Sequence, residues 1–221
     1  MGVLMKNILL RGMDNNQKNL NEMKMILEGK IGEVVLFGDY VGRDSASIIE
    51  NVEERFDDIA NGGEVNLICH SMGCNYGAIL GAIRSSQVKH LVLMSPEIYP
   101  VSLEEKMFNF GLKTDKETSL SKETSEIKTK RSIFEMVDEV HKFKKSAKLA
   151  REILADQTEN DIKCLVMYGM GDKFVSQNSI FKLIKNYSEV TMNNYPTTCH
   201  NLLLSYYGSH VAEDIKKYIL K

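Results

Sequence analysis

Residues 64–85, EVNLICHSMGCNYGAILGAIRS, decide how this chain folds. The stretch opens with a short apolar run and then changes character sharply at His70-Ser71-Met72-Gly73. Beyond this tetrapeptide, apolar residues recur at helical spacing, namely Tyr76, Ile79, Leu80 and Ile83. The pattern therefore predicts a buried strand, an abrupt turn and a helix, with Ser71 at the apex of the turn.

Such a turn needs small residues beside the serine, because bulky side chains two positions away would collide with the neighbouring strand and helix. Gly73 meets this demand after Ser71, and Cys69 stands at the equivalent position before it. The arrangement resembles the nucleophile elbow of the α/β-hydrolase superfamily, whose pattern is G-x-S-x-G. Cys69 departs from that pattern, but its small size makes the departure tolerable. The alternative explanation is an ordinary buried turn in which Ser71 is the helix N-cap.

Composition limits the class of protein. With 221 residues, of which 43% are hydrophobic and 26% charged, the chain is long enough for one α/β domain with a sizeable core. The formal net charge of −2 argues against a nucleic-acid partner. The apolar run near the N-terminus is too short for a signal peptide or a membrane span. Four cysteines without C-x-x-C spacing predict reduced thiols in a cytoplasmic protein: Cys69, Cys74, Cys164 and Cys199.

Strand and helix patterns alternate along most of the chain. Short apolar runs predict strands at residues 7–10, 33–37, 65–69, 89–94, 164–168 and 189–193. Amphipathic patterns predict helices at residues 17–27, 45–60, 132–155 and 176–184, and a last helix that starts near His200 or Val211 and ends at Leu220. This alternation predicts an α/β fold, a three-layer α/β/α sandwich around about six mostly parallel strands.

The resemblance extends from the elbow to the whole chain. It implies a single α/β-hydrolase domain over residues 1–221, without the N-terminal β-hairpin usual in the superfamily, and the strand order 2-1-3-4-5-6. No strand pattern interrupts residues 97–160, which follow the fourth strand. Because the superfamily carries its lid or cap at this place, we expect residues 97–160 to form a helical lid.

A serine hydroxyl needs a base and an orienting acid to act as a nucleophile, and the superfamily supplies them in the chain order Ser, Asp or Glu, His. Asp172 follows a predicted strand in a glycine-flanked loop that resembles the family's acid loop. His200 follows the last predicted strand by a short loop, as the family's histidine does. The resemblance thus implies the triad Ser71, Asp172 and His200. A capping aspartate and a surface histidine are the alternatives, and His210 is the competing base.

The same resemblance implies an oxyanion hole made of two backbone N–H groups. One is that of Met72, directly after the serine. The other is that of Met13, which follows Arg11-Gly12 where the family typically has a His-Gly pair. Arg11 in place of histidine leaves the shape of this loop open.

The expected lid also supplies candidates for a substrate pocket, namely Tyr99, Met107 and Phe108. Met107 and Phe108 have an alternative role, which is to pack the lid onto the sheet, and Tyr99 is expected near the entrance of the pocket. We expect a serine hydrolase that cleaves a small-molecule carboxylic ester or thioester of medium acyl length through an acyl-enzyme intermediate, without a metal or cofactor. Acyl transfer by the same triad, and binding of a small ligand without turnover, are the alternatives. The sequence leaves the oligomeric state open.

Overall fold

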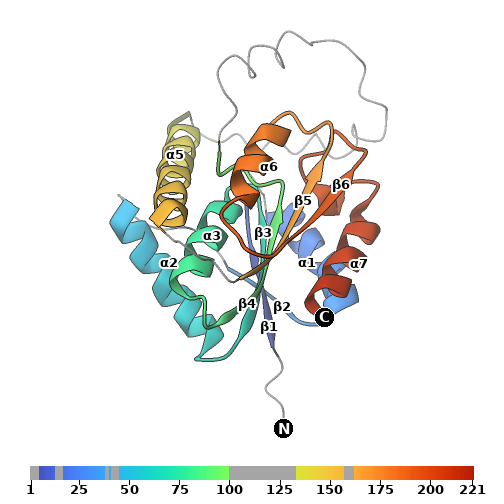
Figure 1. Cartoon of the computed structure of the whole chain (residues 1–221), viewed down its shortest axis with the longest axis horizontal. Helices are drawn as coiled ribbons and strands as arrows, with labels where there is room; N and C mark the ends of the chain where they lie inside the picture. The colour runs from blue at the N-terminus through green and yellow to red at the C-terminus, as the bar shows by residue number, and fades with distance from the viewer. Residues whose placement is uncertain (1–4, 13–16, 38–39, 41–44, 100–132, 157–161) are drawn as a thin grey trace.

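The computed structural model describes residues 5–12, 17–37, 40, 45–99, 133–156 and 162–221. These residues form one layer of strands with helices on both of its faces (Figure 1). The three-layer α/β architecture expected from the alternating pattern is therefore confirmed.

Within the described residues, the sheet contains six strands, all paired in parallel, in the order β2-β1-β3-β4-β5-β6. The strands are β1 (Lys6–Leu10), β2 (Val34–Leu36), β3 (Val65–His70), β4 (Val88–Met94), β5 (Lys163–Gly169) and β6 (Val190–Tyr195). The chain runs outward from β1 to β2 and then returns past β1 to β3, so the order of the strands reverses between β1 and β3. The predicted strand order is confirmed. Ligand sites of open parallel sheets collect at such a reversal, outside the carboxyl ends of the strands.

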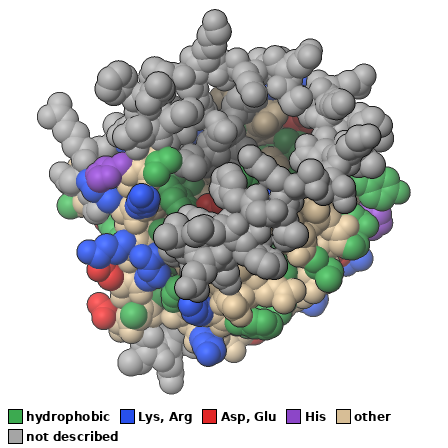
Figure 2. Space-filling view, turned by 90° about the horizontal axis from the view of Figure 1, so that it is seen from above, with side chains coloured by type: hydrophobic (Ala, Val, Ile, Leu, Met, Phe, Trp, Pro, Cys, Tyr) green, Lys and Arg blue, Asp and Glu red, His purple; other side chains and the backbone are tan. Residues whose placement is uncertain are grey.

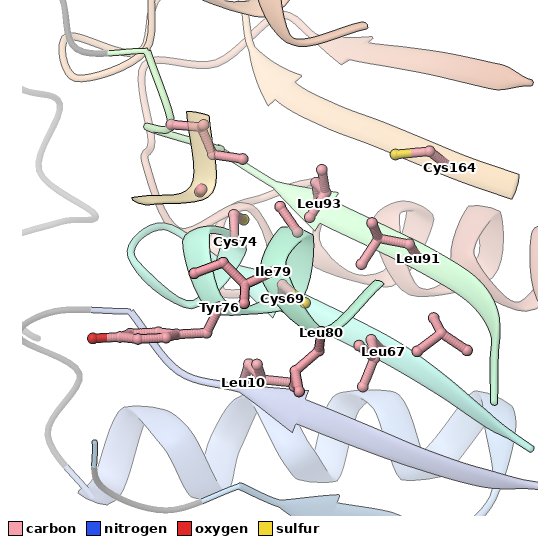
Figure 3. Close-up of a cluster of buried hydrophobic side chains, with 14 of the residues drawn as sticks. Leu10, Leu67, Cys69, Cys74, Tyr76, Ile79, Leu80, Leu91, Leu93 and Cys164 are labelled. Carbon is pink, nitrogen blue, oxygen red and sulfur yellow. The ribbon is translucent and has the colours of Figure 1, made fainter. Parts of the chain in front are cut away.

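Helices cover both faces of the sheet. α1 (Gln17–Ile31) and α7 (Gly208–Ile219) pack on one face, and α2 (Ser45–Ala60), α3 (Gly73–Ile83), α5 (Ile133–Asp156) and α6 (Gln177–Ile184) pack on the other. Successive strand residues serve opposite faces: Cys69 of β3 belongs to the core under α3, and Ile68 belongs to the core under α1. Figure 3 shows part of the first core, where Ile79 and Leu80 of α3 lie over the strands. Burial on both faces explains why the strands read as nearly continuous apolar runs.

Two helix boundaries differ from those expected. The helix predicted at residues 17–27 continues to Ile31. The next residue, Gly32, has a φ of 81°, which suits a glycine after a helix C-terminus. The last helix, α7, begins at Gly208, and a 3-10 turn, η1 (Leu202–Leu204), precedes it. Leu202 and Leu203 are buried in the same core as α7, so their apolar character extended the helical pattern beyond the helix itself.

Helix α5 corresponds to the amphipathic helix expected at residues 132–155. Its residues Ala150 and Leu154 are buried in the core that α2 and α3 also form. Residues 100–132 and 157–161, with Met107 and Phe108 among them, lie outside the described part of the chain. The lid over residues 97–160 therefore stays a prediction. None of the described helices is both long enough and apolar enough to cross a membrane.

Candidate active site

Ser71 occupies a strained turn between β3 and α3. Its φ is 53°, in the left-handed region that residues with a side chain rarely adopt. Its backbone N–H donates to the carbonyl oxygen of Met94 at the end of β4, at 3.0 Å. The N-cap of α3 is Met72, and no side chain caps this helix, so the N-cap explanation for Ser71 does not apply. The turn has the strained geometry of a nucleophile elbow.

Glycines allow the backbone to approach the serine closely. A methyl group added at Gly12 would lie 2.8 Å from Cβ of Ser71, and one added at Gly73 would lie 2.6 Å from the carbonyl oxygen of Arg11. The loop after β1 therefore lies in direct contact with the serine turn. Met13, the expected second oxyanion donor, continues this loop outside the described residues. Met72 heads α3, where the first N–H groups of a helix have no intrahelical acceptor.

The structure brings Ser71, His200 and Asp172 into one chain of hydrogen bonds. Nε2 of His200 lies 2.9 Å from Oγ of Ser71, and Nδ1 of His200 lies 2.8 Å from Oδ2 of Asp172. The carboxylate can only accept, so the imidazole proton resides on Nδ1 and Nε2 accepts the hydrogen bond of the serine hydroxyl. The other carboxylate oxygen, Oδ1, accepts from the backbone N–H of Phe174 at 2.8 Å. A neutral imidazole in this tautomer presents the lone pair of Nε2 to the serine hydroxyl.

Burial and charge determine the electrostatics of the hydrogen-bonded residues Ser71, His200 and Asp172. The side chain of Asp172 is fully buried, whereas that of His200 keeps 22% of its surface exposed. Burial lowers the pKa of His200, but the hydrogen bond and the negative charge of Asp172 outweigh it, so the net pKa is raised above 6.5. Glu97 acts in the same upward direction. The imidazolium that forms when His200 takes a proton is thereby stabilised.

The loops that carry Asp172 and His200 are tied together. The backbone N–H of Met170 donates to the carbonyl oxygen of Tyr195 at 2.8 Å, and that of Gly171 donates to the carbonyl oxygen of Thr197 at 3.0 Å. A methyl group added at Gly169 would lie 2.8 Å from the carbonyl oxygen of Thr197. These contacts hold the loop of Asp172 close to the loop of His200.

Three of the other four histidines, His90, His141 and His210, make no hydrogen bond or ring contact with the triad in the described part of the chain. His210 is exposed on α7, where its ring packs edge-on to Tyr207 with centroids 6.4 Å apart. His90 is buried, with Nδ1 2.9 Å from Oδ1 of Asn66, and His141 is exposed on α5. The hydrogen-bonded position beside Ser71 thus belongs to His200.

Tyr99 is the one expected pocket residue within the described chain. Its side chain is partly buried against the core between the sheet and helices α2, α3, α5 and α6. Its hydroxyl accepts a hydrogen bond from Nδ2 of Asn186 at 3.2 Å. Its hydroxyl is therefore engaged by the segment that follows α6.

Three side chains near the triad were not predicted as functional. Phe174, in the acid loop, is 62% exposed, and its ring centroid lies 5.0 Å from that of His200. Ser95 and His70 both contact the backbone carbonyl of His200. Proximity to Asp172 was the only sequence signal for Phe174, and Ser95 and His70 meet His200 only in the folded chain. Figure 2, the view from above, shows hydrophobic side chains exposed on this face among the residues that the structure describes.

The fold and the strained serine turn define the class of protein as an α/β hydrolase. A family model described as serine aminopeptidase, S33, matches residues 21–205, and the chain belongs to this family. A comparison with curated proteins found no match.

Solved structures with the same fold include lipases and esterases. A monoacylglycerol lipase from Paleococcus ferrophilus shares 11% sequence identity, with a TM-score of 0.64 over 97% of this chain and 93% of that chain. The esterase EaEST from Exiguobacterium antarcticum shares 13%, with a TM-score of 0.67 over 100% and 94%. A soluble variant of the monoglyceride lipase from Saccharomyces cerevisiae, solved with a substrate analog, shares 12%, with a TM-score of 0.68 over 98% and 86%. At these identities the likeness shows the fold.

Proposed function

We propose that this protein is a serine hydrolase that cleaves a carboxylic ester or thioester through an acyl-enzyme intermediate. The observation that carries the proposal is the hydrogen-bonded chain from Ser71 through His200 to Asp172, with 2.9 Å and 2.8 Å between the bonded atoms. A serine at a strained turn, a histidine in the accepting tautomer and a buried carboxylate behind it are the parts that nucleophilic acyl transfer requires.

In the proposed mechanism, Oγ of Ser71 attacks the substrate carbonyl while Nε2 of His200 takes its proton. Asp172, hydrogen-bonded to Nδ1 of His200, stabilises the imidazolium. The backbone N–H of Met72, with that of Met13 as the second donor, stabilises the oxyanion of the tetrahedral intermediate. His200 then protonates the leaving alcohol or thiol. A water molecule, deprotonated by the same histidine, then attacks the acyl-enzyme. The bond between the acyl group and Oγ of Ser71 breaks, His200 returns the proton to Oγ, and the acid is released.

The substrate that we propose is apolar and of medium acyl length. Phe174 and Met170 lie in the loop that carries Asp172 and are 62% and 56% exposed, so this rim of the site offers apolar surface. Tyr99, Met107 and Phe108 are proposed to line the remainder of the pocket. No metal or cofactor is required for this chemistry. We also keep the proposal of a cytoplasmic protein with reduced thiols, since Cys69, Cys74 and Cys164 are free and buried.

Hydrolysis of an amide is the second candidate, because the family description names a serine aminopeptidase. Transfer of the acyl group to an alcohol or amine shares the first half of the reaction and differs only in the final acceptor. Non-catalytic binding of a small ligand on the hydrolase scaffold is the remaining alternative.

The test is a matched substrate panel with wild-type protein and Ser71→Ala. The panel contains p-nitrophenyl esters from acetate to decanoate, the corresponding acyl thioesters, and aminoacyl p-nitroanilides. The proposal predicts turnover of esters or thioesters that rises with chain length to a medium-chain optimum and disappears in Ser71→Ala. Equal rates on acetyl and octanoyl esters would contradict the acyl preference. Faster cleavage of the anilides would favour the peptidase, and product analysis with added alcohol separates hydrolysis from acyl transfer.

A further inference from the structure

The backbone carbonyl of His200 is contacted by two side chains, one from the last residue of β3 and one from the residue that follows β4. Oγ of Ser95 donates a hydrogen bond to it at 2.7 Å, and Nε2 of His70 lies 3.2 Å from the same oxygen. A carbonyl oxygen has two lone pairs, so both donors can be accommodated at once. The same residue that bonds Ser71 and Asp172 through its ring is therefore also anchored through its backbone.

Ser95 is placed for this contact by a strained backbone. It follows β4 directly, is completely buried, and has a φ of 49°. Its own N–H donates to the carbonyl oxygen of Met167 in β5 at 2.8 Å, which fixes the residue between the strands. A buried serine in the left-handed region is uncommon. The hydroxyl of Ser95 donates to the carbonyl oxygen of His200.

His70 acts as a neutral donor. The carbonyl oxygen cannot donate, so Nε2 of His70 must carry the proton of this hydrogen bond. Burial, followed by the charge of the neighbouring His200, lowers the pKa of His70 to about 3. His70 therefore remains uncharged throughout the pH range in which His200 gains or loses its proton, and the contact does not change during that titration.

We propose that Ser95 and His70 are positioning residues that hold the base His200 in its reactive orientation, an inference that rests on the proposed function. Hydrogen bonds to the carbonyl fix the peptide plane after His200 and hence the direction in which its side chain leaves the backbone. Asp172 fixes the ring at its other end. With both ends held, Nε2 stays within bonding distance of Ser71 in each catalytic cycle, and small misplacements of reacting groups cost large factors in rate.

The experiment compares four variants with the wild-type protein by the second-order rate of labelling with a fluorophosphonate. Ser95→Ala removes the hydroxyl, and Ser95→Gly removes it while relieving the strained φ. In His70→Gln the amide nitrogen replaces Nε2, whereas in His70→Asn it replaces Nδ1 and cannot reach the carbonyl of His200. Ser146→Ala is the matched control, since Ser146 is a buried serine on α5 whose hydroxyl also donates to a carbonyl, that of Phe143, at 3.0 Å.

We expect labelling between about tenfold and a hundredfold slower in Ser95→Ala, Ser95→Gly and His70→Asn. His70→Gln and Ser146→Ala should react at nearly the wild-type rate. The second measurement is the downfield proton resonance of the His200–Asp172 hydrogen bond, which should broaden or disappear in the three slow variants alone. A residue with a merely structural role would lower the melting temperature and leave this resonance in place.

The two measurements separate the positioning role of Ser95 and His70 from the reactivity of Ser71. Wild-type protein that shows the resonance but takes up no fluorophosphonate would contradict the serine hydrolase. The positioning role would then be judged by the resonance in the variants. Wild-type labelling with an unchanged rate and resonance in Ser95→Gly and His70→Asn would overturn the positioning role. Equal losses in Ser146→Ala would overturn it as well.

Discussion

At the level of single residues, two opposing effects act on the pKa of His200. Burial lowers its pKa, and the hydrogen bond and charge of Asp172 raise it by more, so the pKa lies above 6.5. Only the neutral imidazole can act as the base. We therefore predict that kcat/KM for an ester falls as the pH falls through the raised pKa of His200.

Asp172→Asn tests the cause of this shift. The substitution removes the upward influence and leaves burial, so the acid limb of the pH–rate profile should move to lower pH. The asparagine also favours the wrong imidazole tautomer, so the plateau should fall by about 10⁴-fold. His210→Ala serves as the control, with a profile like that of the wild-type protein. An acid limb in Asp172→Asn at the wild-type position would contradict this account of the base.

Phe174 offers a second test at this scale. Its ring is 62% exposed beside His200, so its removal should cost little stability and should weaken contact with an apolar substrate. We predict that Phe174→Ala raises KM for a medium-chain ester by roughly fivefold, equivalent to about 1 kcal/mol, with kcat largely retained. Phe181→Ala, which removes a ring 49% exposed on α6, is the matched control. A rise of the same size in both variants would show that Phe174 does not contact the substrate.

At the scale of the secondary-structure elements, Cys69 and Gly77 form a complementary pair. Cys69 occupies the position at which the elbow pattern has its first glycine, and a methyl group added at Gly77 would overlap the sulfur of Cys69. The space for the Cys69 side chain is thus provided by a glycine one helical turn beyond the elbow, in α3. This explains how β3 and α3 pack closely without the first glycine of the pattern.

The pair predicts a specific double-mutant cycle. Gly77→Ala should destabilise the protein by about 1–3 kcal/mol because it overpacks the β3–α3 contact, although alanine is the better helix former. Combination with Cys69→Gly should recover most of this loss, giving a coupling between about 0.5 and 3 kcal/mol. Urea unfolding of the wild-type protein, both single variants and the double variant measures the coupling. Simple additivity of the two single effects would show that the residues do not share this space.

The same elements show what sequence alone could establish. The strand order and most helices were predictable, because burial on both faces produces continuous apolar strands and because helix stripes are local. The start of α7 could not be predicted, because Leu202 and Leu203 are buried in the same core as α7 but lie in the 3-10 turn before it. Chain order was the basis for the prediction of Asp172 and His200, whose side chains lie within hydrogen-bond distance of each other in the structure. Ser95 and His70 were not predicted, because the group that both contact is a backbone carbonyl, which has no sequence signature.

At the scale of the whole molecule, buried histidines make stability depend on pH. Burial, the largest cause, lowers the pKa of His70 from 6.5 to about 3 on folding. Between these two values, His70 is protonated in the unfolded chain and neutral in the folded chain. The contribution of His70 is fully present above pH 6.5 and decreases as the pH falls toward 3. The pKa of His90 is also lowered by burial and acts in the same direction. That of His200 is raised, so its contribution is already complete below pH 6.5.

We therefore predict that the free energy of unfolding declines between pH 6.5 and pH 4, with His70 alone contributing up to about 1.4 kcal/mol per pH unit. His70→Gln removes this contribution and should show a smaller decline. Urea unfolding of both proteins at pH 7 and pH 5 makes the comparison. Equal declines in the two proteins would show that folding does not lower the pKa of His70.

Intact-mass measurement after fluorophosphonate treatment shows whether Ser71 is an activated nucleophile. We predict a single covalent adduct on the wild-type protein and none on Ser71→Ala, with both proteins folded. We also predict much slower adduct formation in His200→Ala and a normal rate in His210→Ala. A folded wild-type protein that forms no adduct, or an adduct that persists in Ser71→Ala, would contradict the assignment of Ser71 as the nucleophile.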